Sequence, residues 1–236
     1  MSSRFPYDKT YLLCFTGYME RKARVERELA RVGIDDAEIL WSFPTPYDAW
    51  EMKHINHVDF FDRHPGCWNV SKNHYRAIKT AYELGMKSLL IIEDDVRFFI
   101  EQERIDKAIA DIPKDWDVLM FDHFKLRGNV NRINDSWVSC EASASTACYA
   151  MTRKAMERFI DMHESPVTKK YANPIMRNCD HWTDVKYLGR DIKFYCASPN
   201  VCIQQTTDGE SNCGRLHSES KYDRFLQNWR NEYAEW

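Results

Sequence analysis

Glycine and proline are both scarce in this chain, with 8 of each among 236 residues. This scarcity excludes collagen-like and low-complexity chains, which are rich in one or both residues. The sequence also lacks the glycine-rich phosphate-binding motifs, since it contains neither G-x-x-x-x-G-K-[ST] nor a strand followed by G-x-G-x-x-G. We therefore expect any bound phosphate to be held by something other than a glycine loop.

The chain has no excess of positive charge, since 33 Lys and Arg residues face 36 Asp and Glu residues. Nucleic-acid-binding domains normally carry a basic excess, so nucleic acid is not an expected partner. No apolar run approaches the roughly 18 residues of a transmembrane helix, and no apolar signal-type segment follows Met1. We expect a cytoplasmic protein, and peripheral contact between its aromatic C-terminal segment and a membrane surface stays open.

Cysteine occurs 8 times, but no C-x-x-C pair and no zinc-type Cys/His spacing is present. Cys14, Cys148 and Cys202 lie in apolar or mixed stretches, where a free thiol behaves as a small apolar side chain. We expect free thiols.

Short apolar segments alternate with amphipathic ones along the chain. Strands are expected at 11–15, 38–41, 88–92, 117–121 and 192–195, and helices at 20–31, 70–84, 105–112, 152–162, 180–188 and 218–236. The segment 142–150 is either a strand or a packed loop, and 42–65 is a long loop, of a length that is usually functional or mobile. This alternation predicts one α/β domain over 1–236, with a mostly parallel central sheet flanked by helices.

Three adjacent carboxylates, Glu93, Asp94 and Asp95, directly follow the apolar strand expected at 88–92. They repel one another unless a positive charge meets them, and a hard divalent cation with oxygen ligands meets that need. Ligands of open α/β sheets bind at the carboxyl ends of strands, which is where these residues fall. The alternative is a solvated acidic turn or a helix N-terminus stabilised by the helix dipole.

Two aspartates, Asp180 and Asp184, are four residues apart and would share one face of the expected helix. One of them could be a general base, or Asp180 could cap the helix while Asp184 is solvated. His217 could supply a neutral imidazole to a metal, although an ordinary surface histidine is the simpler interpretation.

Other candidates also have two interpretations. His74 is either a ligand-contacting residue or a satisfied core histidine, and Arg21 either reaches an anion or lies on a solvated helix face. Most of the 8 tryptophans are expected in the core, but Trp50, Trp68 and Trp182 lie in loop or site-adjacent segments, where their ring faces could pack on the apolar face of a sugar.

The segment 66–96 carries a recognisable arrangement: Gly66, then His74 eight residues later, then an apolar strand ending in Glu93-Asp94-Asp95-Val96. In this arrangement it resembles glycosyltransferase family 25, the group of lipooligosaccharide and collagen galactosyltransferases. Further segments match in the same order, at 116–119, 147–155, Asp180 and 199–205.

The resemblance implies a GT-A-type, Rossmann-like domain that transfers a sugar with inversion from a UDP-sugar, most often UDP-galactose, using Mn²⁺ or Mg²⁺. It implies a nucleotide-sugar-binding half at about 1–122 and an acceptor-binding half at about 123–217, the acceptor being a glycan, glycolipid or glycoprotein. The implied roles are metal binding by Glu93, Asp95 and His217, nucleotide-sugar binding by Arg21, Asp94 and His74, and general base catalysis by Asp180 or Asp184.

Two other functions remain compatible with the same acidic cluster. One is a different metal-dependent phosphoryl or nucleotidyl enzyme, and the other is a non-catalytic glycan-binding protein.

Overall fold

The computed structural model describes residues 5, 7–15, 19–42, 65–98, 101–123, 125–164, 188–189 and 191–204. The expected loop 42–65 lies outside them except at its two ends, as do almost all of the helix expected at 180–188 and the whole helix expected at 218–236. The elements are β1 (Lys9–Phe15), α1 (Met19–Val32), β2 (Glu38–Ser42), α4 (Pro65–Glu83), β3 (Ser88–Glu93), β4 (Val96–Phe98), α5 (Gln102–Ala110), β5 (Val118–Met120), β6 (Lys125–Arg127), β7 (Asn131–Arg132), β8 (Trp137–Ser139), β9 (Ala142–Ala144), β10 (Cys148–Thr152), α6 (Arg153–Glu164), β11 (Phe194–Ala197) and β12 (Cys202–Gln204).

The central sheet has the strand order β2-β1-β3-β10-β5-β11-β8-β7. β1 is parallel to β2 and β3, and β11 is parallel to β5. β10 lies antiparallel between β3 and β5, so β1, β2, β3, β5 and β11 all run in one direction. The predicted α/β class and mostly parallel sheet are confirmed, and the inserted β10 together with the β8–β7 edge makes the sheet mixed.

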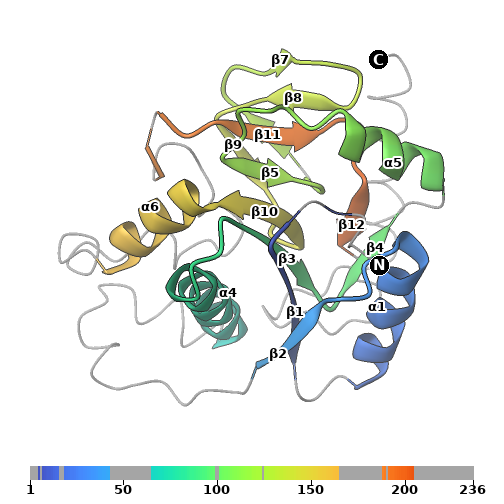
Figure 1. The fold of residues 1–236 in the computed structure, drawn as a ribbon, viewed down its shortest axis with the longest axis vertical. Helices are drawn as coiled ribbons and strands as arrows, with labels where there is room; N and C mark the ends of the chain where they lie inside the picture. The colour runs from blue at the N-terminus through green and yellow to red at the C-terminus, as the bar shows by residue number, and fades with distance from the viewer. Residues whose placement is uncertain are drawn as a thin grey trace.

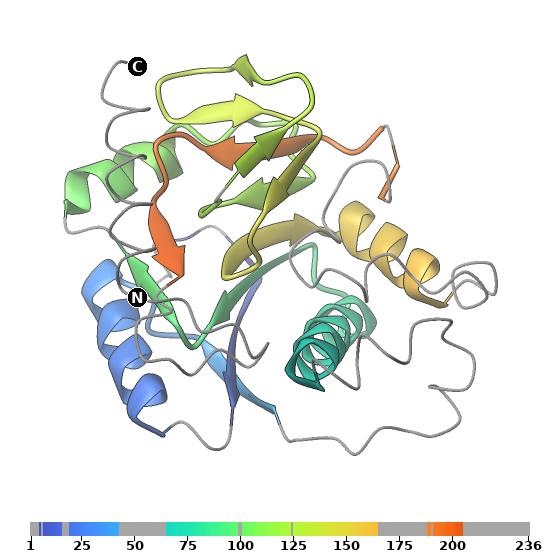
Figure 2. The same cartoon turned by 180° about the vertical axis from the view of Figure 1, so that it is seen from behind.

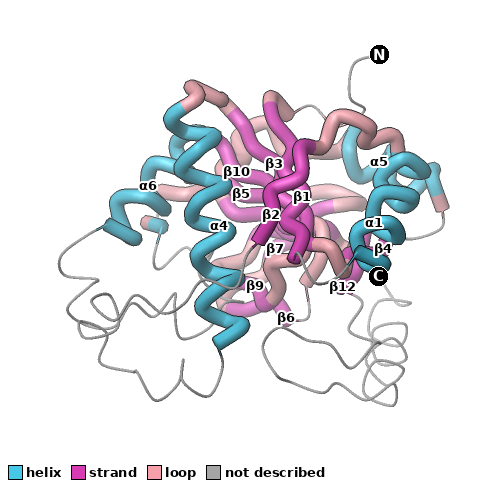
Figure 3. Tube along the Cα trace, turned by 90° about the horizontal axis from the view of Figure 1, so that it is seen from below, coloured by secondary structure: helices cyan, strands magenta, loops and turns pink. Residues whose placement is uncertain are grey.

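Helices cover both faces of this sheet, with α1 and α5 on one side and α4 and α6 on the other (Figure 1; Figure 3). Alternate residues of β1 enter different cores, as expected when successive side chains of a strand point to opposite faces. The first core contains Leu12, Cys14, Val25, Leu29, Ile105 and Ala108. The second contains Tyr11, Leu13, Ala77, Ile78, Met156 and Phe159.

Two helix ends follow from local sequence. Gly33 ends α1 with φ +78°, a conformation that costs glycine little, and Ile34 N–H donates to the Leu29 carbonyl at 2.9 Å. Thr152 precedes α6, and its Oγ1 accepts a hydrogen bond from Ala155 N–H at 3.4 Å, as an N-cap side chain does.

Two short strands far apart in sequence pair beside α1. β4 directly follows the acidic turn, Asp94-Asp95, and β12 runs antiparallel to β4, with Gln204 opposite Val96 (Figure 2). The sequence pattern did not predict β4, because three residues are too few to show a period. The pairing brings Gln204 to the acidic turn.

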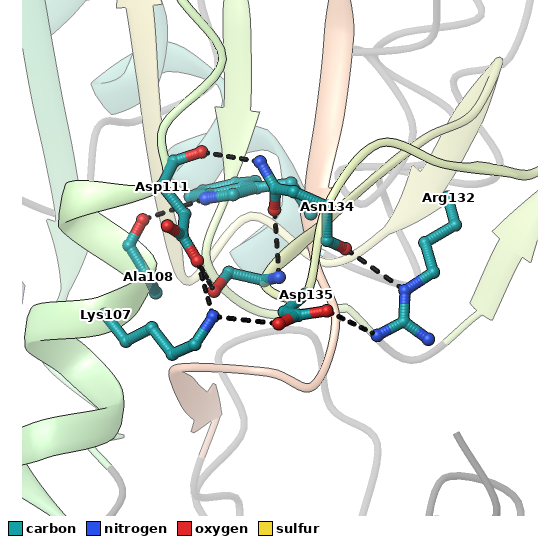
Figure 4. Close-up of polar contacts among 8 residues, drawn as sticks. Lys107, Ala108, Asp111, Arg132, Asn134 and Asp135 are labelled. Atoms are coloured by element: carbon teal, nitrogen blue, oxygen red, sulfur yellow. Dashed lines mark hydrogen bonds and ion pairs between the residues drawn. The ribbon is translucent and has the colours of Figure 1, made fainter.

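The β7–β8 hairpin is fastened to the end of α5 by polar contacts (Figure 4). Trp137 Nε1–H donates to the Ala108 carbonyl at 2.8 Å, and Asn134 Nδ2–H donates to the Asp111 carbonyl at 2.8 Å. Lys107 contacts both Asp111 and Asp135. These contacts fix the antiparallel edge of the sheet, and none of them involves the acidic turn Asp94-Asp95.

Five cysteines are buried free thiols, as expected for small apolar side chains: Cys14, Cys140, Cys148, Cys196 and Cys202. Among the described segments, no helix combines the length and apolar character needed to cross a membrane.

Candidate functional site

Three chain segments meet at the carboxyl ends of β3 and β5. β3 ends at Glu93, and the turn Asp94-Asp95 leads into β4. Because β10 is antiparallel to its neighbours, its first residues lie at the same edge, where Glu93 N–H donates to the Ala147 carbonyl at 2.8 Å. The segment 121–123 continues from β5 to this edge.

Arg21 of α1 pairs with both aspartates of the turn. Its Nη2 lies 2.9 Å from Asp95 Oδ2 and its Nη1 lies 3.6 Å from Asp94 Oδ1. Arg21, Asp94 and Asp95 are 7%, 5% and 6% exposed, so the interpretation of Arg21 as part of a solvated helix face is wrong. The sequence contained a signal for this placement, because Arg21 continues the buried stripe of Val25, Leu29 and Val32.

Among the described carboxylates, Asp95 is the one with a buried oxygen that has no hydrogen-bond partner. Its Oδ2 accepts a hydrogen bond from Gln204 Nε2 at 3.0 Å, whereas its Oδ1 is buried and has no hydrogen-bond partner among the described residues. Burial and the nearby charge of Glu93 raise the pKa of Asp95 well above its usual value, although Arg21 opposes the shift. A buried carboxylate oxygen with no partner among the described residues, beside two further carboxylates, fits a hard cation with oxygen ligands.

The described residues do not by themselves complete a metal site, since they contain no group of three or more His, Cys, Asp or Glu side chains placed to hold an ion. Glu93 and Asp95 would therefore need further ligands from water, a bound diphosphate or a residue such as His217, which lies outside the described residues.

Glu93 is held by neighbours on two other elements. His74 Nε2, from α4, lies 3.0 Å from Glu93 Oε1, and Thr146 Oγ1 donates to the same oxygen at 2.8 Å. Burial alone would raise the pKa of Glu93, but the hydrogen bonds from His74 and Thr146 and the charge of Arg21 lower it.

His74 is 1% exposed, and its Nδ1 lies 2.7 Å from the hydroxyl of Tyr149. The interpretation as a satisfied core histidine is confirmed. Both ring nitrogens face protein groups, so this placement suits holding Glu93 better than direct contact with a nucleotide.

Another buried acid at this edge of the sheet, Asp122, is not among the residues that the sequence pattern indicated. It is 1% exposed; its Oδ1 accepts from Cys148 N–H at 3.1 Å and its Oδ2 accepts from Ser145 Oγ. Burial raises the pKa of Asp122 to about 7. Its position directly after an apolar strand, like that of Glu93, was the available signal.

Ser145, the partner of Asp122, has φ +145°, a backbone conformation that is nearly restricted to glycine. Such a residue costs of order 1–3 kcal/mol and persists only where its surroundings hold it.

The remaining predicted site residues are not placed. Asp180, Asp184, His217, Trp50 and Trp182 lie outside the described residues, and Trp68 lies in α4 with its side chain outside them. Their assignments stay predictions.

No protein-family model and no curated protein matches this sequence. Among solved structures, the chain is similar to A197 from STIV, with 12% identity over 84% of this chain and 95% of that chain and a TM-score of 0.39. It is also similar to a glycosyltransferase involved in the glycosylation of the major capsid of PBCV-1, with 11% identity over 93% and 99% and a TM-score of 0.41. A third is mannose-1-phosphate geranyltransferase from Thermus thermophilus, with 11% identity over 80% and 73% and a TM-score of 0.33.

Proposed function

We propose that this protein is a metal-dependent glycosyltransferase that uses a UDP-sugar donor. UDP-galactose is the proposed donor. The observation that carries the proposal is the buried acidic turn at the carboxyl end of β3, in which Asp95 Oδ1 has no partner among the described residues. Glu93 and Asp95 would hold Mn²⁺ or Mg²⁺, with His217 as a further ligand. The bound ion would neutralise charge on the diphosphate leaving group.

Other residues of the chain hold the acidic side chains in place and remove the proton from the acceptor. Arg21 holds Asp94 and Asp95 in place, and its charge partly offsets theirs. His74 and Thr146 both contact one oxygen of Glu93. Asp180 removes the proton from the acceptor hydroxyl, with Asp184 as the competing base, because inversion requires a base on the side opposite the leaving group.

The acceptor is a hydroxyl of a glycan, glycolipid or glycoprotein. Trp50, Trp68 and Trp182 are the proposed sugar-contacting side chains, and the segment 42–65 is proposed to recognise the acceptor or to cover it. We propose a cytoplasmic location, with the segment 218–236 packing on the domain or touching a membrane surface.

The test is a thermal-unfolding screen of nucleotide sugars on the whole chain, with and without Mn²⁺. A ligand that binds the folded state stabilises it by about 2.7 kcal/mol at one hundred times its dissociation constant. We expect UDP-sugars to raise the melting temperature only when Mn²⁺ is present, and a chelator to remove the effect.

Two outcomes would redirect the proposal. Equal stabilisation with and without metal, combined with sugar binding, indicates a glycan-binding protein. Nucleotide-sugar hydrolysis that reaches its full rate without any acceptor indicates a phosphoryl or nucleotidyl enzyme.

A further inference from the structure

The segment between β9 and β10 is anchored to Asp122 at two points. Ser145 Oγ donates to Asp122 Oδ2, and Cys148 N–H donates to Asp122 Oδ1 at 3.1 Å. Ser145 Oγ also accepts from Ala147 N–H at 3.3 Å. One buried carboxylate therefore holds both ends of the segment 145–148.

The two residues between these anchors both contact Glu93. Thr146 Oγ1 donates to Glu93 Oε1 at 2.8 Å, and the Ala147 carbonyl accepts from Glu93 N–H at 2.8 Å. The direction of the Thr146 side chain depends on the backbone of Ser145, which has φ +145°. A relaxed backbone at Ser145 would turn Thr146 away from Glu93.

We propose that Asp122 and Ser145 are positioning residues: they fix the segment 145–148 in its strained conformation, and through Thr146 they fix the carboxylate of Glu93. The inference rests on the proposed function, because it assigns to Glu93 the role of a cation ligand. It assigns a role in that function to two residues, Asp122 and Ser145, that contact neither the ion nor the donor. Strained backbone held by a specific side chain is a recurrent feature of functional sites.

The decisive comparison is between Ser145→Ala and Ser145→Gly. Both variants lose the hydroxyl, but only glycine adopts φ +145° without strain. Calorimetric titration of the full chain with Mn²⁺ alone should show about a tenfold loss of affinity in Ser145→Ala and less than about threefold in Ser145→Gly, since partners of metal ligands commonly contribute tenfold or more. A purely structural hydroxyl would give equal losses in both.

Matched variants complete the test. Thr146→Val should lose about as much Mn²⁺ affinity as Ser145→Ala, and Asp122→Ala should do the same. Asp122→Asn should recover most of the affinity, because an amide can still accept from Cys148 N–H and bond to Ser145 Oγ. Ser139→Ala, at the far edge of the sheet, should change nothing. Equal Mn²⁺ affinity in Asp122→Ala and the unmodified protein would overturn the proposal.

A second measurement needs no metal. In urea unfolding, a double-mutant cycle between Asp122→Ala and Thr146→Val should show non-additive free energies, since the two residues are coupled through the segment. If the unmodified protein binds no Mn²⁺, the metal dependence in the proposed function is wrong. The double-mutant cycle still tests whether Asp122 and Thr146 are coupled. Additive free energies would overturn the inference whatever the metal result.

Discussion

Arg21 Nη2 of α1 lies 2.9 Å from Asp95 Oδ2, in the turn after β3, and both side chains are buried. This is the shorter of the two ion pairs that join Arg21 to the turn Asp94-Asp95. Arg21 also approaches Asp94 at 3.6 Å, so one guanidinium serves two carboxylates. The turn is therefore only partly neutralised by the described part of the protein, and this imbalance leads to the first two predictions.

Arg21→Met should destabilise the protein by about 3–5 kcal/mol, because it removes a buried cation that contacts the carboxylates of both Asp94 and Asp95. Urea unfolding measures the loss. The control is Lys22→Met, on the same helix, which removes a more exposed ion pair with Glu26 and should cost about 0.5 kcal/mol or less. Similar losses in the two variants would contradict the pairing. Adding Mn²⁺ should narrow the gap between Arg21→Met and the unmodified protein if the ion binds this turn.

Asp95→Ala should abolish sugar transfer and Mn²⁺-dependent UDP binding while the chain stays folded. It removes the carboxylate whose Oδ1 has no hydrogen-bond partner in the described part of the chain. Transfer assays, UDP titration with Mn²⁺ and circular dichroism measure the three properties. Asp135→Ala, which removes an exposed carboxylate on the β7–β8 hairpin, should leave all three unchanged. Full transfer in Asp95→Ala would show that the metal assignment is wrong.

His123 should make the protein less stable in mild acid. Its Nε2–H donates to the Ala197 carbonyl at 3.0 Å, and burial lowers its pKa to about 4. In the unfolded chain the His123 imidazole binds a proton with a pKa of about 6.5, whereas in the folded chain its pKa is about 4. The stability that the neutral folded histidine contributes is therefore fully present above pH 6.5 and is lost as the pH falls toward 4. The loss attributable to this group is at most about 3 kcal/mol.

The measurement for His123 is urea unfolding of the protein and of His123→Gln from pH 7.5 to pH 4.5. Glutamine can donate to the same carbonyl but does not titrate, so the difference between the two curves isolates the histidine. The difference should shift in favour of the variant as the pH falls. Parallel curves would show that His123 accepts its proton in the folded state.

Asp180→Asn should lose sugar transfer and keep UDP binding, since a general base contributes to the chemical step and not to donor affinity. Asp184→Asn is the matched variant, four residues away and of the same chemistry. Single-turnover transfer rates and UDP titrations distinguish the two. If Asp184→Asn alone shows this behaviour, then Asp184 is the base.

Much of the fold could be predicted from local pattern. The strand at 88–92 and the helix at 20–31 both correspond to observed elements, because apolar runs and helical periodicity are encoded by neighbouring residues. The short strands β4, β7 and β8 could not be predicted, because two or three residues show no period and form only against partners.

The candidate site also has one part that local sequence predicts and another part that depends on long-range contacts. The position of Glu93, Asp94 and Asp95 after a buried strand could be predicted, since position after an apolar run is a local property. The groups that contact these residues come from distant parts of the chain: Arg21 from α1, His74 from α4, Thr146 before β10 and Gln204 from β12. Those partners depend on the antiparallel insertion of β10 and on the pairing of β12 with β4, which are long-range contacts that no local pattern encodes.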